Sequence, residues 1–216
     1  MKIAKGCKIW IFSALIPSLI FLILYQIFYR EIVGSIFLLF SFALLLLTWL
    51  FLMFFRDPDR KIGKGIVVCA DGKIREISNI KDKKIGNCIL ISTFMNIQNV
   101  HVNRMPVDGK IVDMVHREGI HLPAFKKESE KNERVTLTID SKLGKIKIVL
   151  IAGTLARRIV PYVKIGDKLK KGERIGIIRL GSRVDVYLPK DKIKKPCVKE
   201  GDRVKAGEDC LAEIYD

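Results

Sequence analysis

The hydrophobic pattern divides the chain into two parts of different character. No charged residue occurs in residues 9–29, and after Arg30 and Glu31 a second uncharged run covers residues 32–55. A helix needs about 20 apolar residues to cross the hydrocarbon layer of a bilayer, which is roughly 30 Å thick. Each run is long enough, so the pattern predicts two transmembrane helices, about 9–29 and 32–55, joined by a very short turn.

Basic residues flank this apolar hairpin on both sides. Cytoplasmic segments beside membrane helices carry an excess of Lys and Arg, so both flanks are predicted to be cytoplasmic. A cleaved signal peptide is the alternative, but the first run exceeds a typical h-region and the second follows without a clear small-x-small cleavage site. We therefore expect residues 1–56 to anchor the chain in the cell membrane and residues 57–216 to form a cytoplasmic domain. The flanking basic residues are Lys2, Lys5, Lys8, Arg56, Arg60, Lys61 and Lys64.

The remainder of the chain has the pattern of a β protein. Short runs rich in Ile and Val, such as residues 88–92, 135–139 and 145–151, alternate with turns that contain Gly, Asp and Lys. Runs of this length between turn residues are typical of strands and hairpins. No long amphipathic helix is evident after residue 60, so residues 57–216 are predicted to be all-β.

Two internal echoes indicate a repeated architecture. Residues 163–173 return as residues 198–208, which share a G-D-x-[LV]-K-x-G-E pattern, and residues 71–74 return as residues 108–111. The pattern resembles the hairpin of biotinyl/lipoyl-type barrel-sandwich modules, in which glycines supply tight corners with positive φ. Two echoes are too few for a solenoid. We expect a mainly β, barrel-sandwich-like domain with pseudo-repeats.

The charge of the chain bears on its partners. The sequence is 49% hydrophobic and 29% charged with a net charge of +16, so apolar and charged residues must be segregated. Each Lys or Arg near an anionic leaflet contributes about 1 kcal/mol of attraction, which makes an anionic membrane surface the expected partner. Nucleic acid is the alternative, but few aromatic residues interleave the basic ones to stack on bases. A thermophile-like enrichment in Lys and Glu also fits the composition.

Cysteine and histidine positions argue against metal chemistry. The five cysteines are odd in number and scattered without a C-x-x-C pair, which argues against a disulfide framework or a thiolate zinc site and for a reducing compartment. Of the three histidines, His116 and His121 are five positions apart and share no face of a helix or strand, so no metal site is expected. We read both as surface or loop residues. The cysteines are Cys7, Cys69, Cys88, Cys197 and Cys210.

Several segments together resemble the phosphatidylserine decarboxylase proenzymes, in the short form that includes the archaetidylserine decarboxylases. The motif around Gly181 and Ser182 is the most characteristic. Each segment alone is a weak signal, but the set occurs in the family's order and covers nearly all of the soluble chain. The matching segments are residues 55–58, 70–72, 99–109, 130–134, 151–160 and 181–189.

The resemblance implies that the chain cuts itself between Gly181 and Ser182. The Ser182 hydroxyl would attack the preceding carbonyl, and a glycine there permits the strained backbone that this step needs. The products would be a β chain, residues 1–181, and an α chain, residues 182–216, that begins with a pyruvoyl group. This group would form a Schiff base with the substrate amine and accept the electrons left by CO₂, so neither a metal nor pyridoxal phosphate is expected.

The same resemblance implies roles for two further residues. Self-cleavage needs a general base for the Ser182 hydroxyl and a group that orients that base. His101 matches the family's histidine, and Asp71 its carboxylate partner. After cleavage His101 would handle protons in decarboxylation. From the residues alone, Asp71 is also consistent with a simple Asp-Gly turn.

The chain departs from the longer members of the family at Arg104, where those proteins carry a second histidine. Separate roles for two histidines therefore do not carry over. Arg104 is expected either to bind the substrate carboxylate or phosphate or to form a structural ion pair. Arg157 and Arg158 either face the phosphodiester or form a solvated strand end, and residues 132–134 match a family motif whose role the sequence leaves open.

The expected function is therefore a membrane-anchored, pyruvoyl-dependent decarboxylase that converts a serine phospholipid to the ethanolamine lipid and CO₂. The resemblance implies that the α and β chains stay together as a heterodimer, and a higher homo-oligomer is also expected. A membrane-tethered carrier or adaptor module without catalytic activity is the alternative, although no Met-Lys-Met or Asp-Lys-Ala tripeptide for lysine modification occurs. The chemistry of the lipid tails, ester or ether, stays open.

Overall fold

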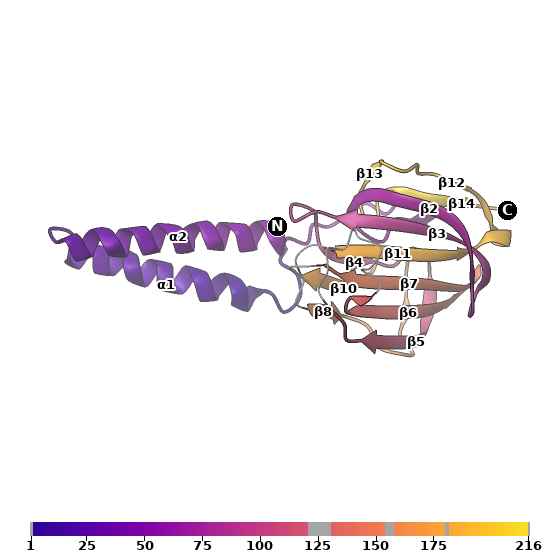
Figure 1. The fold of residues 1–216 in the computed structure, drawn as a ribbon, viewed down its shortest axis with the longest axis horizontal. Coiled ribbons are helices and arrows are strands. Elements are labelled where there is room, and N and C mark those ends of the chain that lie inside the picture. The colour runs from indigo at the N-terminus through magenta and orange to yellow at the C-terminus, as the bar shows by residue number, and fades with distance from the viewer. Residues whose placement is uncertain (1, 121–130, 154–157, 180–181, 216) are drawn as a thin grey trace. The chain divides into compact units, whose positions relative to one another are not determined.

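The computed structural model describes residues 2–120, 131–153, 158–179 and 182–215 (Figure 1). The chain divides into two compact units, Met1–Pro58 and Asp59–Asp216. The first unit is helical and the second consists almost entirely of strands. The prediction of a mainly β fold behind two apolar helices is confirmed, although the sheets remain open and close into no barrel among the described residues.

The first unit is a pair of packed helices, α1 (Lys8–Ile27) and α2 (Ile32–Phe54). Both are long enough and apolar enough to cross a membrane. Most of their large apolar side chains point outward and are exposed, including Ile9, Leu39 and Phe42. A helix satisfies its own backbone hydrogen bonds, so an apolar exterior of this kind is compatible with surrounding lipid.

Two buried serines join the helices. The Ser18 hydroxyl donates to the Ser41 carbonyl at 3.0 Å, and the Ser41 hydroxyl donates to the Ser18 carbonyl at the same distance. The aromatic rings of Phe21 and Phe40 stack near this contact, with centroids 5.5 Å apart. Small polar residues allow close helix approach and hydrogen bonding where the surroundings offer no water.

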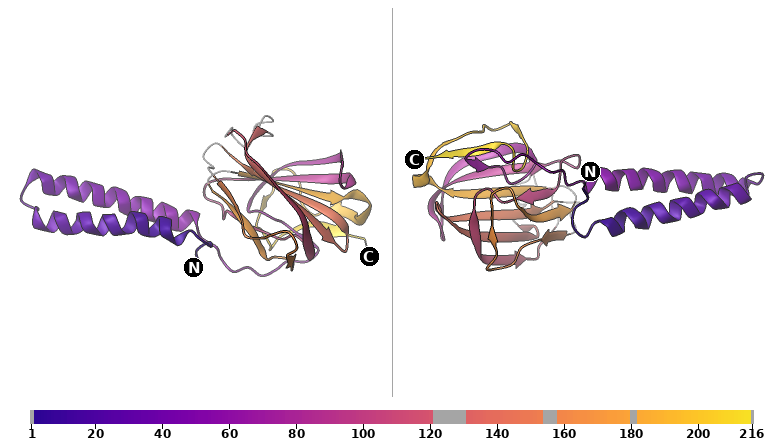
Figure 2. Two further views of the ribbon diagram at one scale, coloured as in Figure 1. Left: turned by 90° about the horizontal axis from the view of Figure 1, so that it is seen from below. Right: turned by 180° about the vertical axis from the view of Figure 1, so that it is seen from behind.

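The second unit is built on one eight-stranded antiparallel sheet, which is strongly twisted (Figure 2). Alternate side chains along its strands enter the buried core, which is rich in Ile, Leu and Val. In spatial order the strands are β13 (Arg203–Val204), β2 (Gly72–Asp82), β3 (Gly86–Met95), β11 (Ser182–Pro189), β7 (Gly144–Ala152), β6 (Arg134–Ser141), β5 (Gly109–Arg117) and β9 (Lys168–Leu169).

Two three-stranded sheets complete the unit. The first has the order β1 (Ile66–Val67), β14 (Cys210–Ile214) and β12 (Ile193–Pro196), and the second has the order β4 (Val102–Arg104), β10 (Arg174–Arg179) and β8 (Arg158–Pro161). A short 3₁₀ helix, Lys190–Lys192, links β11 to β12. The buried residues of the two small sheets, such as Ile66, Ile178 and Leu211, belong to the same core as those of the large sheet.

The order of the strands shows that the β unit consists of two related halves. Read from its two edges, the large sheet runs β13-β2-β3-β11 and β9-β5-β6-β7, and the small sheets run β1-β14-β12 and β4-β10-β8. Two pairs of corresponding strands share the same offset along the chain: β9 and β13 start at residues 168 and 203, and β8 and β12 start at residues 158 and 193. The pseudo-repeats seen in the sequence are therefore the two halves of one pseudo-symmetric fold.

Equivalent hydrogen bonds recur in the two halves. Gly166 donates to the Ile111 carbonyl and Gly201 donates to the Ile74 carbonyl, each at 2.8 Å. These glycines have φ values of 98° and 95°, a region that residues with a Cβ rarely adopt. Each Gly-Asp turn thus pairs with one copy of the Asp-Gly-Lys-Ile segment. The two kinds of repeated segment found in the sequence therefore contact each other within each half.

One half is inserted into the other along the chain. Strands β4 to β10 form a continuous half, whereas the other half combines β1 to β3 with β11 to β14. In the continuous half, β6 passes directly to β7 through a tight turn in which the Ser141 hydroxyl donates to the Gly144 carbonyl. In the other half, strands β4 to β10 come between β3 and β11 along the chain.

The structure corrects the expectation for the cysteines. Cys197 and Cys210 form a disulfide with their Cα atoms 5.8 Å apart, while Cys7, Cys69 and Cys88 are free and buried. The antiparallel pairing of β12 with β14 brings the two together, a proximity that their spacing in the sequence did not reveal. Disulfides are uncommon in reducing compartments, so the cysteine positions no longer favour one.

We expect the disulfide to stabilise the β unit. Because it closes a short loop, replacing Cys197 and Cys210 with alanine should lower the free energy of unfolding by about 3 kcal/mol. Thermal unfolding of the full chain with and without a reductant measures this, and the double variant, which has no bond to reduce, is the control. Equal unfolding temperatures for the unmodified chain with and without reductant would contradict the assignment.

Candidate active site

Ser182 lies at the centre of the large sheet. It is the first residue of β11 and pairs in register with Met95 on β3 and with Ala152 on β7. Its side chain is fully buried, and its hydroxyl donates to the Met95 sulfur at 3.1 Å. Ladders on both sides therefore fix the backbone of residue 182, while Gly181, the other half of the predicted cleavage site, lies outside the described residues.

His101 lies beside the strand that leads to Ser182. It is fully buried, its carbonyl accepts the Ile178 amide at 3.3 Å, and its Nδ1 is 2.8 Å from the Asn99 carbonyl. A proton on Nδ1 donated to that carbonyl leaves Nε2 as the basic nitrogen. The chain reaches His101 from Met95, the hydrogen-bond partner of Ser182, through the turn at residues 96–99. The structure thus places His101 against β10 and Ser182 at the first residue of β11.

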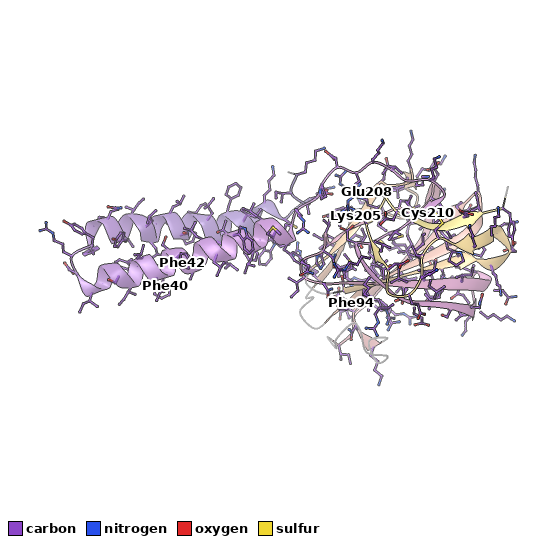
Figure 3. All side chains as sticks on the ribbon, turned by 90° about the horizontal axis from the view of Figure 1, so that it is seen from above. Phe40, Phe42, Phe94, Lys205, Glu208 and Cys210 are labelled. Carbon is purple, nitrogen blue, oxygen red and sulfur yellow. A yellow bond between two sulfur atoms is a disulfide. The ribbon has the colours of Figure 1, made fainter. Side chains whose placement is uncertain are left out.

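Asp71 has two partners of its own. One carboxylate oxygen accepts Arg60 Nη2 at 2.8 Å and the other accepts the Ala206 amide at 2.7 Å. Glu208 lies 3.8 Å from both Arg60 and Lys205, and Figure 3 labels Lys205 and Glu208 on the segment that leads into β14. Both oxygens are therefore occupied without His101, the residue that Asp71 was expected to orient.

The pseudo-symmetry explains one of these bonds. Asp108, the counterpart of Asp71, accepts the Lys171 amide at 2.7 Å, and Lys171 is the counterpart of Ala206. Each aspartate thus caps the turn of its own half. Asp71 differs from Asp108 in that it also forms a buried ion pair with Arg60.

Arg104 lies between the equivalent turns of the two halves. Its side chain is buried and Nη1 donates to the Gly172 carbonyl at 3.0 Å. A Cβ on Gly207, the counterpart of Gly172, would approach Arg104 Cδ to 2.9 Å. These contacts tie Arg104 to the two turns, while the ion pair and the substrate-binding role both stay predictions.

Residues 132–134, whose role the sequence left open, support the strand next to Ser182. The Asn132 amide group donates to the Ala152 carbonyl at 2.7 Å, and the Ala152 amide donates to the Glu133 carbonyl at 3.0 Å. Because Ala152 pairs with Ser182, Asn132 helps to hold the site's backbone. The match to a family motif was the only sequence signal for this role.

Glu133 extends the support to neighbouring strands. Its carboxylate accepts the amide of Ile159 on β8 at 3.4 Å and lies 2.9 Å from His116 Nε2. His116 is on β5 with its side chain half exposed. Arg158 is exposed at the start of β8, whereas His121 and Arg157 lie outside the described residues.

The face of the sheet opposite the Ser182 side chain carries a buried carboxylate. Asp185 accepts the Ser92 hydroxyl at 2.7 Å and Arg183 Nη2 at 2.9 Å. Burial raises the pKa of Asp185 above its usual range and outweighs the opposing effect of Arg183. Burial, followed by the Asp185 charge, raises the pKa of Tyr187 to about 12, and Lys147 lies 3.8 Å above its ring.

No metal cluster marks the site among the described residues. In residues 2–120, 131–153, 158–179 and 182–215 no group of three or more His, Cys, Asp or Glu side chains could hold a metal. An open cleft of about 640 Å³ lies at the other end of the large sheet, lined by residues that include Lys110, Asp140 and Lys168. Ser182 and His101 are themselves buried.

Comparisons with known proteins agree with the motifs. The family model described as phosphatidylserine decarboxylase matches residues 47–212. A protein of Methanosarcina barkeri named "Putative archaetidylserine decarboxylase proenzyme" is 40% identical over 215 residues, covering 98% of each chain. The "Phosphatidylserine decarboxylase proenzyme" of Thermobifida fusca is 48% identical over 156 residues, covering 72% of this chain and 69% of the relative.

The raised pKa of Asp185 makes stability depend on pH. The folded state holds this proton more tightly than the unfolded state, so the unmodified chain should lose stability relative to Asp185→Asn as pH rises from about 4 through the raised pKa. Asp113, whose pKa a hydrogen bond from Lys84 lowers, is the control: relative to Asp113→Asn, stability should instead fall as the solution is acidified below about pH 4. Unfolding temperatures across this range test both signs, and a parallel dependence of the two differences would contradict the assignment.

Proposed function

The chain belongs to the phosphatidylserine decarboxylase family, and on this premise we propose that it decarboxylates serine lipids after cutting itself between Gly181 and Ser182. Its substrate is phosphatidylserine or archaetidylserine, which share the same headgroup. The observation that carries the proposal is the position of Ser182, buried at the first residue of a central strand and close in the fold to the His101 segment.

Cleavage begins with an acyl shift. The Ser182 oxygen attacks the Gly181 carbonyl carbon, the peptide C–N bond breaks, and the hydroxyl proton ends on the Ser182 nitrogen. Loss of the Ser182 α-proton then expels the Gly181 carboxylate and leaves a dehydroalanine, which tautomerises and hydrolyses with release of ammonia. His101 is the proposed base, which the Nδ1 contact to the Asn99 carbonyl supports because it keeps Nε2 available for the proton.

A pyruvoyl group formed at position 182 supplies a carbonyl that draws in the electron pair left by departing CO₂. The surroundings fit such a group. Among the described residues, the hydrogen-bond acceptor of the Ser182 hydroxyl is the Met95 thioether, and a thioether is a weak acceptor. Conversion of the hydroxyl-bearing residue to a ketone thus sacrifices no strong hydrogen bond. After cleavage His101 is left to return a proton to the substrate carbon.

Burial supports the order of the two reactions. Ser182 and His101 are both inaccessible in the uncut chain, so a lipid headgroup cannot reach them until the junction opens. Opening need not release the α chain. Within residues 182–216, β11 pairs with β3 and β7, β14 pairs with β1, and β13 pairs with β2. The fragments would therefore stay together as a heterodimer.

Helices α1 and α2 are proposed to hold the enzyme in the cell membrane, where its substrate lies. Both pass the length and composition test for membrane spans, and their basic flanks favour a cytoplasmic β unit. Confinement of enzyme and substrate to one bilayer raises their effective concentration. The enzyme is also proposed to assemble into a higher homo-oligomer.

Self-cleavage can be tested by intact-mass measurement. We expect two fragments divided between Gly181 and Ser182, with the smaller one blocked at its N-terminus and reactive toward carbonyl reagents. Ser182→Ala should remove both cleavage and decarboxylation, because no oxygen remains to attack, and His101→Ala should slow cleavage, decarboxylation or both. Ser92→Ala, which changes a buried serine on neighbouring β3, should still be cut. An uncut, active chain would contradict the proposal.

The paired aspartates separate a catalytic from a structural role for Asp71. Asp71→Asn and Asp108→Asn each weaken one equivalent turn cap, at a cost of about 1–3 kcal/mol. Asp71→Asn also weakens the buried ion pair with Arg60, so Arg60→Gln, which removes that pair and keeps the Asp71 carboxylate, is a second control. If Asp71 also assists His101, as proposed, only its variant should slow cleavage by tenfold or more, roughly the effect of losing 1.4 kcal/mol in a transition state. Equal cleavage rates for the two aspartate variants would mean that Asp71 only caps its turn and does not assist His101.

A further inference from the structure

A row of basic side chains crosses the large sheet one position from Ser182. Arg183 on β11 pairs with Phe94 on one side and Ile151 on the other, and the pairing continues outward from these two residues. Across the sheet this register row contains five basic residues, called the basic row below: Arg203, Lys73, Arg183, Arg134 and Arg117.

The members of the basic row share one face and one end of the sheet. Side chains of directly paired residues lie on the same side of a sheet, and neighbours along a strand point to opposite sides. The row therefore faces away from the buried Ser182 hydroxyl. It also lies at the end of the sheet where β11 begins at Ser182, because β6 begins at Arg134 and β5 ends at Arg117.

The charge of this row is little compensated. Arg183 pairs with Asp185, one step further along the same face, where Glu76 also lies. Among the described residues, no carboxylate pairs with Lys73, Arg117, Arg134 or Arg203. Lys73, Arg117 and Arg203 are exposed. Phe94 and Ile151 lie on either side of Arg183 in this row, and Ile151 is buried.

The opposite end of the sheet differs. There, the register row runs Lys168, Lys110, Asp140 and Lys145, so one carboxylate lies among three lysines. The basic row at the Ser182 end contains no carboxylate. This difference is a property of the register and is not visible in the overall net charge of +16.

We propose that the basic row is the surface by which the β unit lies on an anionic bilayer, with its cations against lipid phosphates. The inference rests on the proposed function, which requires a lipid headgroup to reach residue 182. Consecutive residues of a strand are about 3.3 Å apart, so a bilayer close enough to deliver a headgroup to residue 182 is within reach of these long side chains. Each exposed cation would strengthen docking by about fivefold.

The test uses the full chain in lipid nanodiscs, with an environment-sensitive fluorophore on Val115→Cys. Val115 lies on the same face as Arg117, two positions along β5, and is partly exposed. Discs of phosphatidylcholine are compared with discs that also contain phosphatidylglycerol. The fluorophore should report a less polar environment in the anionic discs, and about 1 M salt, which shortens the Debye length to about 3 Å, should remove the difference.

Charge variants identify the surface. Removing three exposed members of the row, in the variant Lys73→Gln, Arg117→Gln and Arg203→Gln, should abolish the difference between the two kinds of disc. The matched control Lys110→Gln, Lys142→Gln and Lys145→Gln removes the same charge at the other end of the sheet and should preserve it. A signal that is the same in neutral and anionic discs, or equally affected by both variants, would overturn the proposal. So would a signal that follows the number of protein copies per disc, which indicates a second chain on this face.

Intact mass keeps this proposal separate from the proposed function. Self-cleavage of each variant is measured in the same discs, since it involves no contact with lipid. If the chain is not cut but the anion-dependent signal depends on the basic row, the surface stands and the proposed function fails. If all variants are cut and the fluorescence signal does not change when the basic row is altered, the proposed function stands and the basic row is not the docking surface.

Discussion

The two hydrogen-bonded ladders of β11 are the constraint on which the site depends. Strand β11 lies between β3 and β7, and its first residue is paired on both sides. A serine on a loop would sample many positions, whereas Ser182 has one, held by the backbone of Met95 and Ala152. Asn132 and Glu133 in turn hold Ala152, so the rigidity of the site extends across three strands. Precise placement of the reacting atoms is what such rigidity contributes to catalysis.

The pseudo-symmetry shows how the fold could tolerate the proposed break in its own chain. The two halves are related, but only one is continuous. A cut between Gly181 and Ser182 would remove a connection along the chain while the pairing of β11 with β3 and β7, and of β3 with β2, remains. The same pseudo-symmetry supplies an internal comparison, because Asp108 repeats the turn-capping contact of Asp71 without its ion pair to Arg60.

Register also separates two kinds of chemistry on one strand. Ser182 faces the apolar core beside Met95, while Arg183 and Asp185 face the other side among polar partners. The alternation of side chains along β11 thus buries the Ser182 hydroxyl on one face and puts cations at the same end of the sheet on the opposite face.

The sequence by itself determined the two apolar helices, the β character of the rest, the pseudo-repeats and the candidate residues Ser182 and His101, because periodicity and motifs are local properties of a chain. Tertiary structure alone decided which residues meet. The disulfide of Cys197 and Cys210, the partners of Asp71 and Arg104, and the support of Ala152 by Asn132 all join positions brought together by strand pairing. The alignment of five basic residues in one row has the same origin, since register between distant strands follows from the packing of a common core.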